Sequence, residues 1–228
     1  RDSFKAFHFR NYNIMNSNKK ETKIKKRENI RLEDFSFHAP KSGYAPAEDS
    51  WLLAHAIEKY AKQIYGKKCL DMGCGNWIQT AALLLSGAAK VTCIDINEDA
   101  LTQTKKMIEK YFPKKKEKVN YVHSFLFEKV PKTKKFDAVV FNPPYVPSET
   151  IKWVEVDGGR NGREIIDAFL GALPVHLTRN GVCFLLQTSL NSLFLTRKKC
   201  AEKGLKTYVV AREKLAFEEL QIVKITHR

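Results

Sequence analysis

The chain has 228 residues, with 43% hydrophobic and 29% charged residues and a formal net charge of +15 at pH 7. These values predict a soluble globular protein of one domain, or one domain with a tail, that is large enough to bury a substantial core. They exclude a membrane-spanning protein, because the longest apolar run, near residues 81–85, is far too short to cross a bilayer.

The positive charge lies in two segments. Residues 1–31 carry ten Lys and Arg against three acids, and residues 105–135 carry eleven against three, so these segments account for the whole excess. The first segment is polar and rich in Asn and Lys, which predicts a disordered basic tail before a folded domain at 32–228. Lysines on solvated faces explain this charge at least as well as nucleic acid does, so nucleic acid is the less favoured partner.

The five cysteines form no CxxC pair, and the six histidines show no metal-ligand spacing. We therefore expect reduced core thiols and no metal site. The chain does not open with a secretory signal pattern, so we expect a cytoplasmic protein, with a nuclear pool as the alternative.

Helix-like and strand-like segments alternate along the domain. In chain order we expect a helix at 51–66 with Pro46 in its first turn, a strand at 68–72, a helix ending at 85, a strand at 90–94, a helix at 98–111 capped by Asn97, strands at 119–127 and 136–141, a helix at 162–177, a strand at 182–187, a helix at 193–203, and strands at 205–211 and 221–226. This alternation predicts a doubly wound α/β sheet with right-handed crossovers, closed by an antiparallel hairpin.

The strand at 136–141 is followed by Asn142-Pro143-Pro144-Tyr145. The prolines cannot donate to the sheet and they fix the backbone, so Asn142 is held extended where the chain leaves the strand. This corner offers two acceptors, the Asn142 side-chain oxygen and the Pro143 carbonyl, with the Tyr145 ring as a flat wall. Two acceptors can hold both hydrogens of an –NH2 group and leave its nitrogen lone pair free to attack an electrophile.

An earlier pattern indicates the cofactor. The strand at 68–72 leads into Asp71-x-Gly73-x-Gly75 and a helix, and Asp95 follows the next strand. Glycines let a ligand approach the backbone and the second acid binds ribose hydroxyls, an arrangement that NAD, FAD and S-adenosylmethionine folds share. Trp77 replaces the third glycine of the NAD pattern, which disfavours NAD as the cofactor. The two acceptors that hold an attacking –NH2 group favour S-adenosylmethionine, because its methyl sulfonium is the electrophile that such a nitrogen attacks.

Five segments occur in order: Tyr44-x-Pro46-x-Glu48-Asp49-Ser50, Asp71-x-Gly73-x-Gly75, Asp95, Asn142-Pro-Pro-Tyr145 and Gly158-Gly-Arg-Asn-Gly-Arg-Glu164. From about residue 40 to the end, the chain resembles the HemK-type glutamine N5-methyltransferases, and specifically the eukaryotic branch that modifies the class I translation release factor. The resemblance implies a class I S-adenosylmethionine-dependent methyltransferase fold, with a mostly parallel seven-stranded sheet and an antiparallel C-terminal strand.

The resemblance also implies roles for single residues. The cofactor, S-adenosyl-L-methionine, would contact Ser50, Asp71, Gly73 and Gly75 around its methionine end, Asp95 at the ribose and Leu126 at the adenine, with Asn142 beside it. Asn142 and Pro143 would hold the substrate amide, and Tyr145 would pack against its plane. Residues 158–164 would shape the rim of the substrate pocket.

Two positions depart from the family pattern. Phe125 stands where the family usually has an aspartate that bonds the adenine amine, and the loss of such a bond lowers affinity about ten- to a hundredfold. Trp77 replaces the last glycine of the cofactor loop. Both departures predict weakened cofactor binding.

The strand at 119–127 is apolar on both faces, and in the strand order of class I methyltransferases it lies at the sheet edge. An exposed apolar edge needs a cover, and pairing with a partner strand is one such cover. The resemblance implies a small zinc-binding activator protein as that partner. Lysine-rich flanks that simply protect the edge are the alternative.

The predicted reaction is a direct methyl transfer to a glutamine side-chain nitrogen in a Gly-Gly-Gln loop, in which positioning rather than a strong base provides the rate. Three alternatives remain open: an adenine-N6 DNA or RNA methyltransferase, a lysine methyltransferase, and a non-catalytic scaffold with weakened cofactor binding.

Overall fold

The computed structural model describes residues 30–40, 43–149 and 155–228. The chain divides into two units, residues 1–35 and residues 36–228. In the described part of the first unit, residues 32–34 form a short 3-10 helix, η1 (Leu32–Asp34), whose preceding amide, that of Arg31, donates to the Asp34 carboxylate at 2.9 Å. Residues 1–29 of the predicted tail lie outside the described part, so its character stays a prediction.

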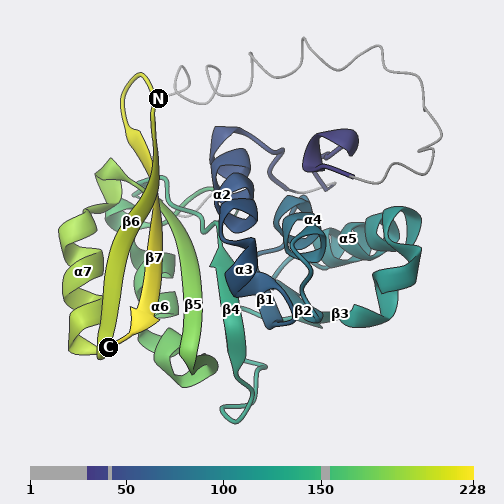
Figure 1. Ribbon diagram of the computed structural model, residues 1–228. Helices are drawn as coiled ribbons and strands as arrows, with labels where there is room; N and C mark the ends of the chain where they lie inside the picture. Colours follow the sequence, from purple (N-terminus) through teal and green to yellow (C-terminus); the bar gives the residue numbers. More distant parts are fainter. Residues whose placement is uncertain (1–29, 41–42, 150–154) are drawn as a thin grey trace. The chain divides into compact units, whose positions relative to one another are not determined.

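The second unit is built on one seven-stranded sheet with the order β3-β2-β1-β4-β5-β7-β6. The strands are β1 (Lys68–Met72), β2 (Lys90–Asp95), β3 (Val119–His123), β4 (Phe136–Phe141), β5 (Leu177–Thr188), β6 (Leu205–Lys214) and β7 (Glu219–His227). The first five in the order above are parallel, and β7 is antiparallel to both β5 and β6. The predicted doubly wound sheet with an antiparallel C-terminal hairpin is therefore confirmed (Figure 1).

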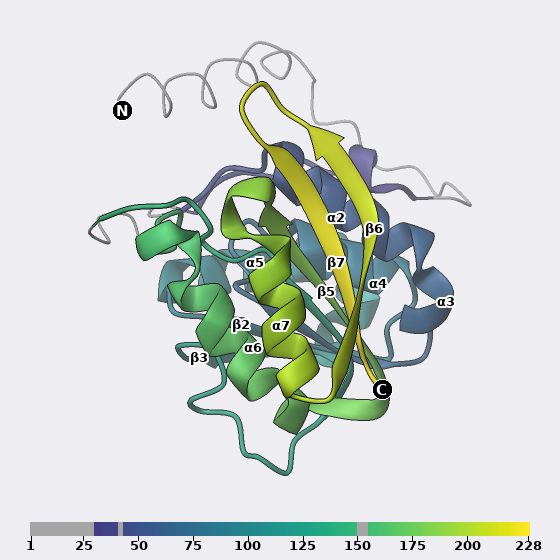
Figure 2. The same cartoon turned by 90° about the vertical axis from the view of Figure 1, so that its left-hand side faces the viewer.

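Helices cover both faces of this sheet. They are α2 (Glu48–Lys59), α3 (Ala61–Ile64), α4 (Ile78–Leu85), α5 (Glu98–Tyr111), α6 (Glu164–His176) and α7 (Leu193–Glu202), with short 3-10 segments η2 (Pro113–Lys118), η3 (Arg160–Gly162) and η4 (Ser189–Asn191). Figures 1 and 2 show α2, α4 and α5 on one face and α6 and α7 on the other. No helix of the described residues is long and apolar enough to cross a membrane.

The strand register places the predicted site residues at one edge. Met72 of β1 lies opposite Ile94 of β2 and Phe141 of β4. The residues that follow these three strands therefore emerge side by side at the carboxyl edge of the sheet, which is where ligands bind in open parallel sheets. The core below them is apolar on both faces, as the fully buried consecutive residues Val139 and Val140 of β4 show.

Most predicted element bounds agree with the structure to within a few residues, and α5 agrees at both ends. Its N-cap, Asn97, accepts a hydrogen bond from the Asp99 amide at 2.9 Å, as the sequence predicts. The predicted helix at 51–66 is two helices, because Tyr60 leaves the helical conformation, with its ring 5.3 Å from that of Phe184. Pro46 precedes the N-cap Ala47, so its placement in the first turn was wrong.

The third strand is shorter than predicted. It ends at His123, and the chain then turns through Leu126, whose φ is +44°. This turn aims Phe127 inward, where its ring stacks on His176 at 4.4 Å and lies 5.6 Å from Phe169. An apolar run that looked like more strand is thus a turn that packs against α6.

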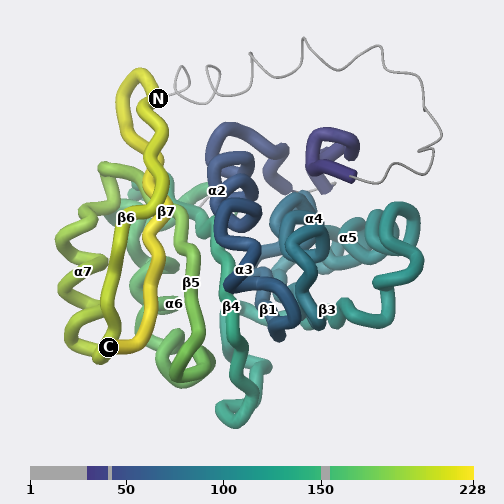
Figure 3. The backbone as a smooth tube through the Cα atoms, viewed as in Figure 1, coloured from purple at the N-terminus to yellow at the C-terminus, as the bar shows by residue number. Residues whose placement is uncertain are grey.

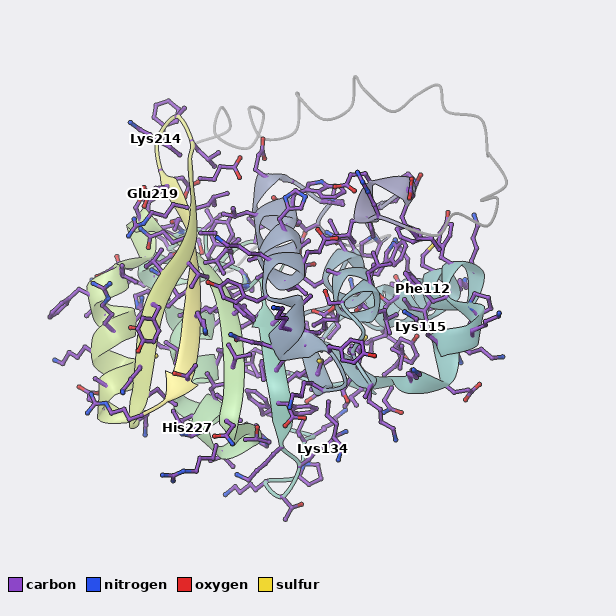
Figure 4. The ribbon with its side chains drawn as sticks, viewed as in Figure 1. Phe112, Lys115, Lys134, Lys214, Glu219 and His227 are labelled. Atoms are coloured by element: carbon purple, nitrogen blue, oxygen red, sulfur yellow. The ribbon has the colours of Figure 1, made fainter. Side chains whose placement is uncertain are left out.

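Among the strands of the described residues, β3 and β6 are the two edges of the sheet. Beside β3, the Lys115 ammonium donates to the Leu84 carbonyl at 2.7 Å and lies 5.8 Å from the Phe112 ring centre (Figure 4). At the other edge, the tube in Figure 3 shows β6 and β7 continuing past the ends of the parallel strands. Lys214 and Glu219 stand where this hairpin projects (Figure 4), and Arg212 is paired with Glu219.

Candidate active site

A cavity of about 490 Å³ opens at the carboxyl edge of β1, β2 and β4. Of the residues predicted to bind cofactor or substrate, the structure brings eight to its lining: Ser50, Gly73, Gly75, Asp95, Leu126, Asn142, Pro143 and Tyr145. Among the residues that the structure describes, no group of three or more His, Cys, Asp or Glu side chains could hold a metal ion. All five cysteines are buried and free.

A neighbouring carboxylate sets the orientation of the Asn142 side-chain amide. Its Nδ2 donates to Oδ2 of Asp49 at 3.2 Å, and a carboxylate can only accept, so the amide must face Asp49 with its nitrogen. The Asn142 Oδ1 is left buried, with no hydrogen-bond partner among the described residues. A buried acceptor without a partner costs free energy, so this atom is a ready site for a donor from a ligand.

Asp49 is the residue that sequence reasoning undervalued, since it appeared only as a member of the Tyr44–Ser50 segment and was given no role in the site. It is 3% exposed. The Tyr145 hydroxyl donates to its Oδ2 at 3.1 Å and the Tyr44 hydroxyl to its Oδ1 at 3.3 Å. The Ser50 amide donates to the same Oδ1 at 2.5 Å. The signal in the sequence was its placement in the Glu-Asp-Ser segment, which a helix dipole alone does not explain.

The electrostatics of this cluster follow from burial. Burial raises the pKa of Asp49 above its ordinary value, although hydrogen bonds from Asn142, Ser50 and Tyr145 oppose the shift. Burial and the charge of Asp49 raise the pKa of Tyr44 and Tyr145. Both phenols are therefore neutral donors to one carboxylate, which fixes the ring of Tyr145 beside Asn142.

Residues 158–164 pack against the backbone of the Asn-Pro-Pro-Tyr corner and support it. The Gly158 amide donates to the Val146 carbonyl at 2.9 Å. A Cβ at Gly162 would lie 2.0 Å from the Tyr145 carbonyl oxygen, and one at Gly158 would lie 2.7 Å from that of Pro144. Glycine is required because the two backbones touch there.

Residues 158–164 do not line the cavity themselves, so their expected role in shaping the pocket rim stays a prediction. The cavity is lined instead by their neighbours Glu155, Val156 and Ile165. Arg163 explains the charged part of the segment: its Nη2 donates to Asp167 at 2.6 Å and its Nη1 to Thr196 Oγ1 at 3.1 Å. The segment therefore joins the corner to α6 and α7.

Asn191, which sequence reasoning missed, completes this support. It is fully buried at the end of η4. Its Nδ2 donates to the Tyr145 carbonyl at 2.8 Å and to the Gly162 carbonyl at 3.2 Å, and its Oδ1 accepts from the Thr188 amide at 2.8 Å. Asn191 also accepts, through its own carbonyl, a hydrogen bond from Arg163. The local Thr188-x-x-Asn191 capping pattern does not indicate its bonds to the corner, because those partners are far away in sequence.

The cofactor half of the cavity is formed by the two glycines and Asp95. Gly73 has φ +67° and Gly75 φ +41°, which favour glycine. The Asp95 carboxylate accepts from the Gly75 amide at 2.9 Å and from the Asn97 amide at 2.8 Å. Burial raises the pKa of Asp95, and these backbone donors oppose the shift. The glycines leave the backbone accessible to a ligand, and the Asp95 carboxylate is held in position beside them. A carboxylate of this kind can bind the hydroxyls of a ribose, and the apolar Leu126 can contact a base.

Asp71 is not among the residues that line the cavity, so its predicted contact with the cofactor stays a prediction. It is 1% exposed and lies within β1, where its Oδ2 accepts from the Thr80 hydroxyl at 2.5 Å. Its side chain thus ties the strand to α4. Burial raises the pKa of Asp71 to about 7.

Trp77 and Phe125, the two departures from the family pattern, lie differently with respect to the cavity. Trp77 takes the left-handed backbone conformation, φ +62°, in which glycine is favoured, but its ring is fully buried away from the cavity. It stacks on Tyr111 at 5.6 Å and lies 4.5 Å from Phe37. Trp77 therefore leaves the cofactor space open. Its presence does not favour a non-catalytic scaffold over an enzyme. Phe125 does line the cavity, as an apolar wall.

Comparison with known proteins agrees with this geometry. Residues 48–186 match the family model named Methyltransferase small domain. A relative from Methanocaldococcus jannaschii, provisionally named protein N5-glutamine methyltransferase MJ0928, is 34% identical over 85% of this chain and 96% of its own length. Human Methyltransferase HEMK2 is 31% identical over 80% of this chain and 89% of its own length. The chain belongs to the HemK-type methyltransferase family.

Solved structures agree with this assignment. The E. cuniculi Mtq2-Trm112 complex, described as responsible for methylating the translation termination factor eRF1, contains a chain that is 27% identical with a TM-score of 0.65. The match covers 82% of this chain and 99% of that chain. The T. thermophilus 16S rRNA methyltransferase RsmC in complex with AdoMet, at 21% identity and a TM-score of 0.61, shares the fold. S-adenosylmethionine is the methyl donor general to such proteins.

The contact between residues 158–164 and the corner predicts a sharp difference between two glycines. Gly162→Ala forces a Cβ into the Tyr145 carbonyl at φ +64° and should lower the free energy of unfolding by about 2–4 kcal/mol. Gly171→Ala is the matched control, because Gly171 lies inside α6 and a Cβ added there would meet nothing within 4 Å. This substitution should raise the free energy of unfolding by up to about 1 kcal/mol. Urea denaturation measures both, and equal stabilities would contradict the contact.

The buried Asp71 predicts a pH-dependent stability. Its pKa in the folded chain, about 7, lies above the unfolded value of about 4, so the free energy of unfolding should fall as pH rises between these values, by at most about 1.4 kcal/mol per unit. Asp71→Asn cannot ionise and should flatten this slope, whereas the exposed Asp99→Asn should leave it unchanged. Denaturation at pH 5, 6, 7 and 8 tests this; parallel profiles of wild type and Asp71→Asn would refute it.

Proposed function

We propose that this chain transfers the methyl group of S-adenosyl-L-methionine to the side-chain amide nitrogen of the glutamine in the Gly-Gly-Gln loop of the class I translation release factor. The observation that carries the proposal is the Asn142 amide, whose nitrogen is bonded to Asp49 and whose buried oxygen has no partner among the described residues. Relatives named as release-factor methyltransferases support the choice of substrate, among them the fission yeast eRF1 methyltransferase catalytic subunit mtq2, 28% identical over 86% of this chain.

The chain's residues act on the substrate amide by position. Asn142 and Pro143 both line the cavity, and in the proposed reaction the Asn142 Oδ1 and the Pro143 carbonyl each accept one hydrogen of the –NH2 group. With both hydrogens held in one plane, the lone pair of the amide nitrogen is directed out of that plane. The Tyr145 ring, fixed through its hydroxyl to Asp49, packs against the amide and excludes the unproductive face.

The donor supplies an electrophilic methyl group when it is bound. Ser50, Gly73, Gly75, Asp95 and Leu126 would hold it, and Phe125 adds apolar contact where the family usually bonds the adenine amine. Cofactor affinity would therefore depend on burial more than on a charged hydrogen bond. Because an amide nitrogen is a weak nucleophile, orientation of the two reactants provides most of the rate.

The substrate assay tests this function. Wild-type chain with labelled S-adenosylmethionine should modify purified release factor but neither the same protein with its Gly-Gly-Gln glutamine replaced nor a DNA or RNA oligonucleotide. Asn142→Ala should lower kcat on release factor by at least about a hundredfold, because the amide loses its alignment.

Affinity for S-adenosylmethionine, measured by calorimetry, is the control for folding. It should change less than about threefold in Asn142→Ala, since the donor is held chiefly by other residues. Equal loss of donor affinity and turnover would indicate a folding defect. Modification of an oligonucleotide or a histone in preference to release factor would overturn the proposed substrate.

We also propose that a small zinc-binding activator protein covers β3. This strand is one of the two free edges of the sheet, and it pairs only with β2 among the described residues. Tyr121 and Val122 on it are half-buried, so a partner would remove further apolar surface from water. The Mtq2-Trm112 complex supports the existence of such a partner in this family.

Co-expression with this activator should raise the soluble yield of the chain and its activity on release factor. A Val122→Lys substitution on the edge strand should reverse the gain, because it places a charge in the shared interface. Yield and specific activity of the purified protein are measured with and without the activator. If the isolated chain is equally soluble and equally active, the proposed partner is wrong.

A further inference from the structure

Four large apolar side chains are exposed around the end of β5 and the tip of the β6–β7 hairpin. Leu190 is 48% exposed, Phe194 72%, Leu195 43% and Phe217 76%. We call these four residues the apolar rim. Exposed phenylalanines cost solvation free energy, and clusters of them on a soluble chain mark contact surfaces.

The two segments of the rim meet at the same end of the sheet. Thr188, the last residue of β5, pairs with Leu220 of β7, and the Glu219 amide donates to Ser189 Oγ at 3.1 Å. Leu190 and Phe217 follow and precede this junction by a few residues. Figure 2 shows the hairpin extending past the point where α7 begins.

The rim is continuous with the catalytic corner. Asn191, next to Leu190, donates to the Tyr145 carbonyl at 2.8 Å. On the hairpin, Phe217 lies two residues before Glu219, whose amide is bonded to Ser189 directly after β5. Both rim segments therefore lie at the carboxyl edge of β5, which is the edge of the parallel sheet at which the pocket opens.

A buried polar network fixes the rim to the core. Thr196 donates to Gln187 at 2.7 Å, Gln187 to Gln221 at 3.4 Å and Gln221 to Glu219 at 2.8 Å. Arg163 joins Thr196 to Asn191, so hydrogen bonds run from the hairpin to the corner. These buried hydrogen bonds favour one arrangement of the segments that carry the rim.

We propose that the apolar rim docks the folded body of the release factor beside its Gly-Gly-Gln loop. The proposal rests on the proposed function, because a glutamine in a protein loop can enter the pocket only if the protein around it contacts the pocket mouth. The activator is assigned to β3, the opposite edge of the sheet, which leaves the rim to the substrate. Aromatic side chains are the usual anchors of such contacts.

Two single variants and their combination test the rim: Phe194→Ser, Phe217→Ser and both together. With folded release factor as substrate and the activator present, each single variant should raise KM about tenfold while kcat stays within about twofold. A short peptide carrying the Gly-Gly-Gln loop should be methylated equally by wild type and variants, because it does not reach the rim.

Tyr65→Ser is the matched control, because Tyr65 is 75% exposed but precedes β1 at the amino edge of the sheet. It should leave both kinetic constants unchanged. An unchanged KM in the double variant, or an equal rise in the control, overturns the docking role. If the variants instead lose the activator, or convert a dimer into a monomer, the rim serves another partner and the proposal is wrong. A wild-type chain that leaves release factor unmodified defeats the proposed function itself.

Discussion

The active site depends on one buried carboxylate, that of Asp49. It receives hydrogen bonds from Tyr44 before the first helix, from Ser50 within it, and from Asn142 and Tyr145 after β4. Removing a charge from water is costly, and these donors offset part of that cost. The same hydrogen bonds connect segments that are more than ninety residues apart in the sequence, 93 in the case of Asp49 and Asn142.

Sequence patterns predicted what depends on neighbouring residues. The prolines after Asn142 fix the corner locally, the apolar runs fix the strands, and Asn97 fixes the start of α5, so each was found without the fold. The carboxyl-edge location of the site also followed from the alternation of strands and helices. The HemK-type resemblance rested on the same short segments, and the comparisons confirm it.

What the sequence did not reveal depends on contacts between distant segments. Asn191 looks like an ordinary polar residue until β5 places it behind Tyr145. Asp71 was expected beside the cofactor, and no sequence pattern indicated that its carboxylate also accepts a hydrogen bond from Thr80 of α4. Trp77 looked like an obstruction, yet its left-handed backbone sends the ring into the core. In each case the direction of a side chain, which a pattern does not contain, decided its role.

The support of the corner by Asn191 bears on how the enzyme forms. Residues 48–186 match the family model, but Asn191 and the hairpin that follows come later in the chain. The corner residues leave β4 long before Asn191 is synthesised, so a nascent chain that has emerged only as far as β5 carries every motif residue without this support for the Tyr145 carbonyl. The order of synthesis thus separates the residues that form the pocket from one that holds its corner in place.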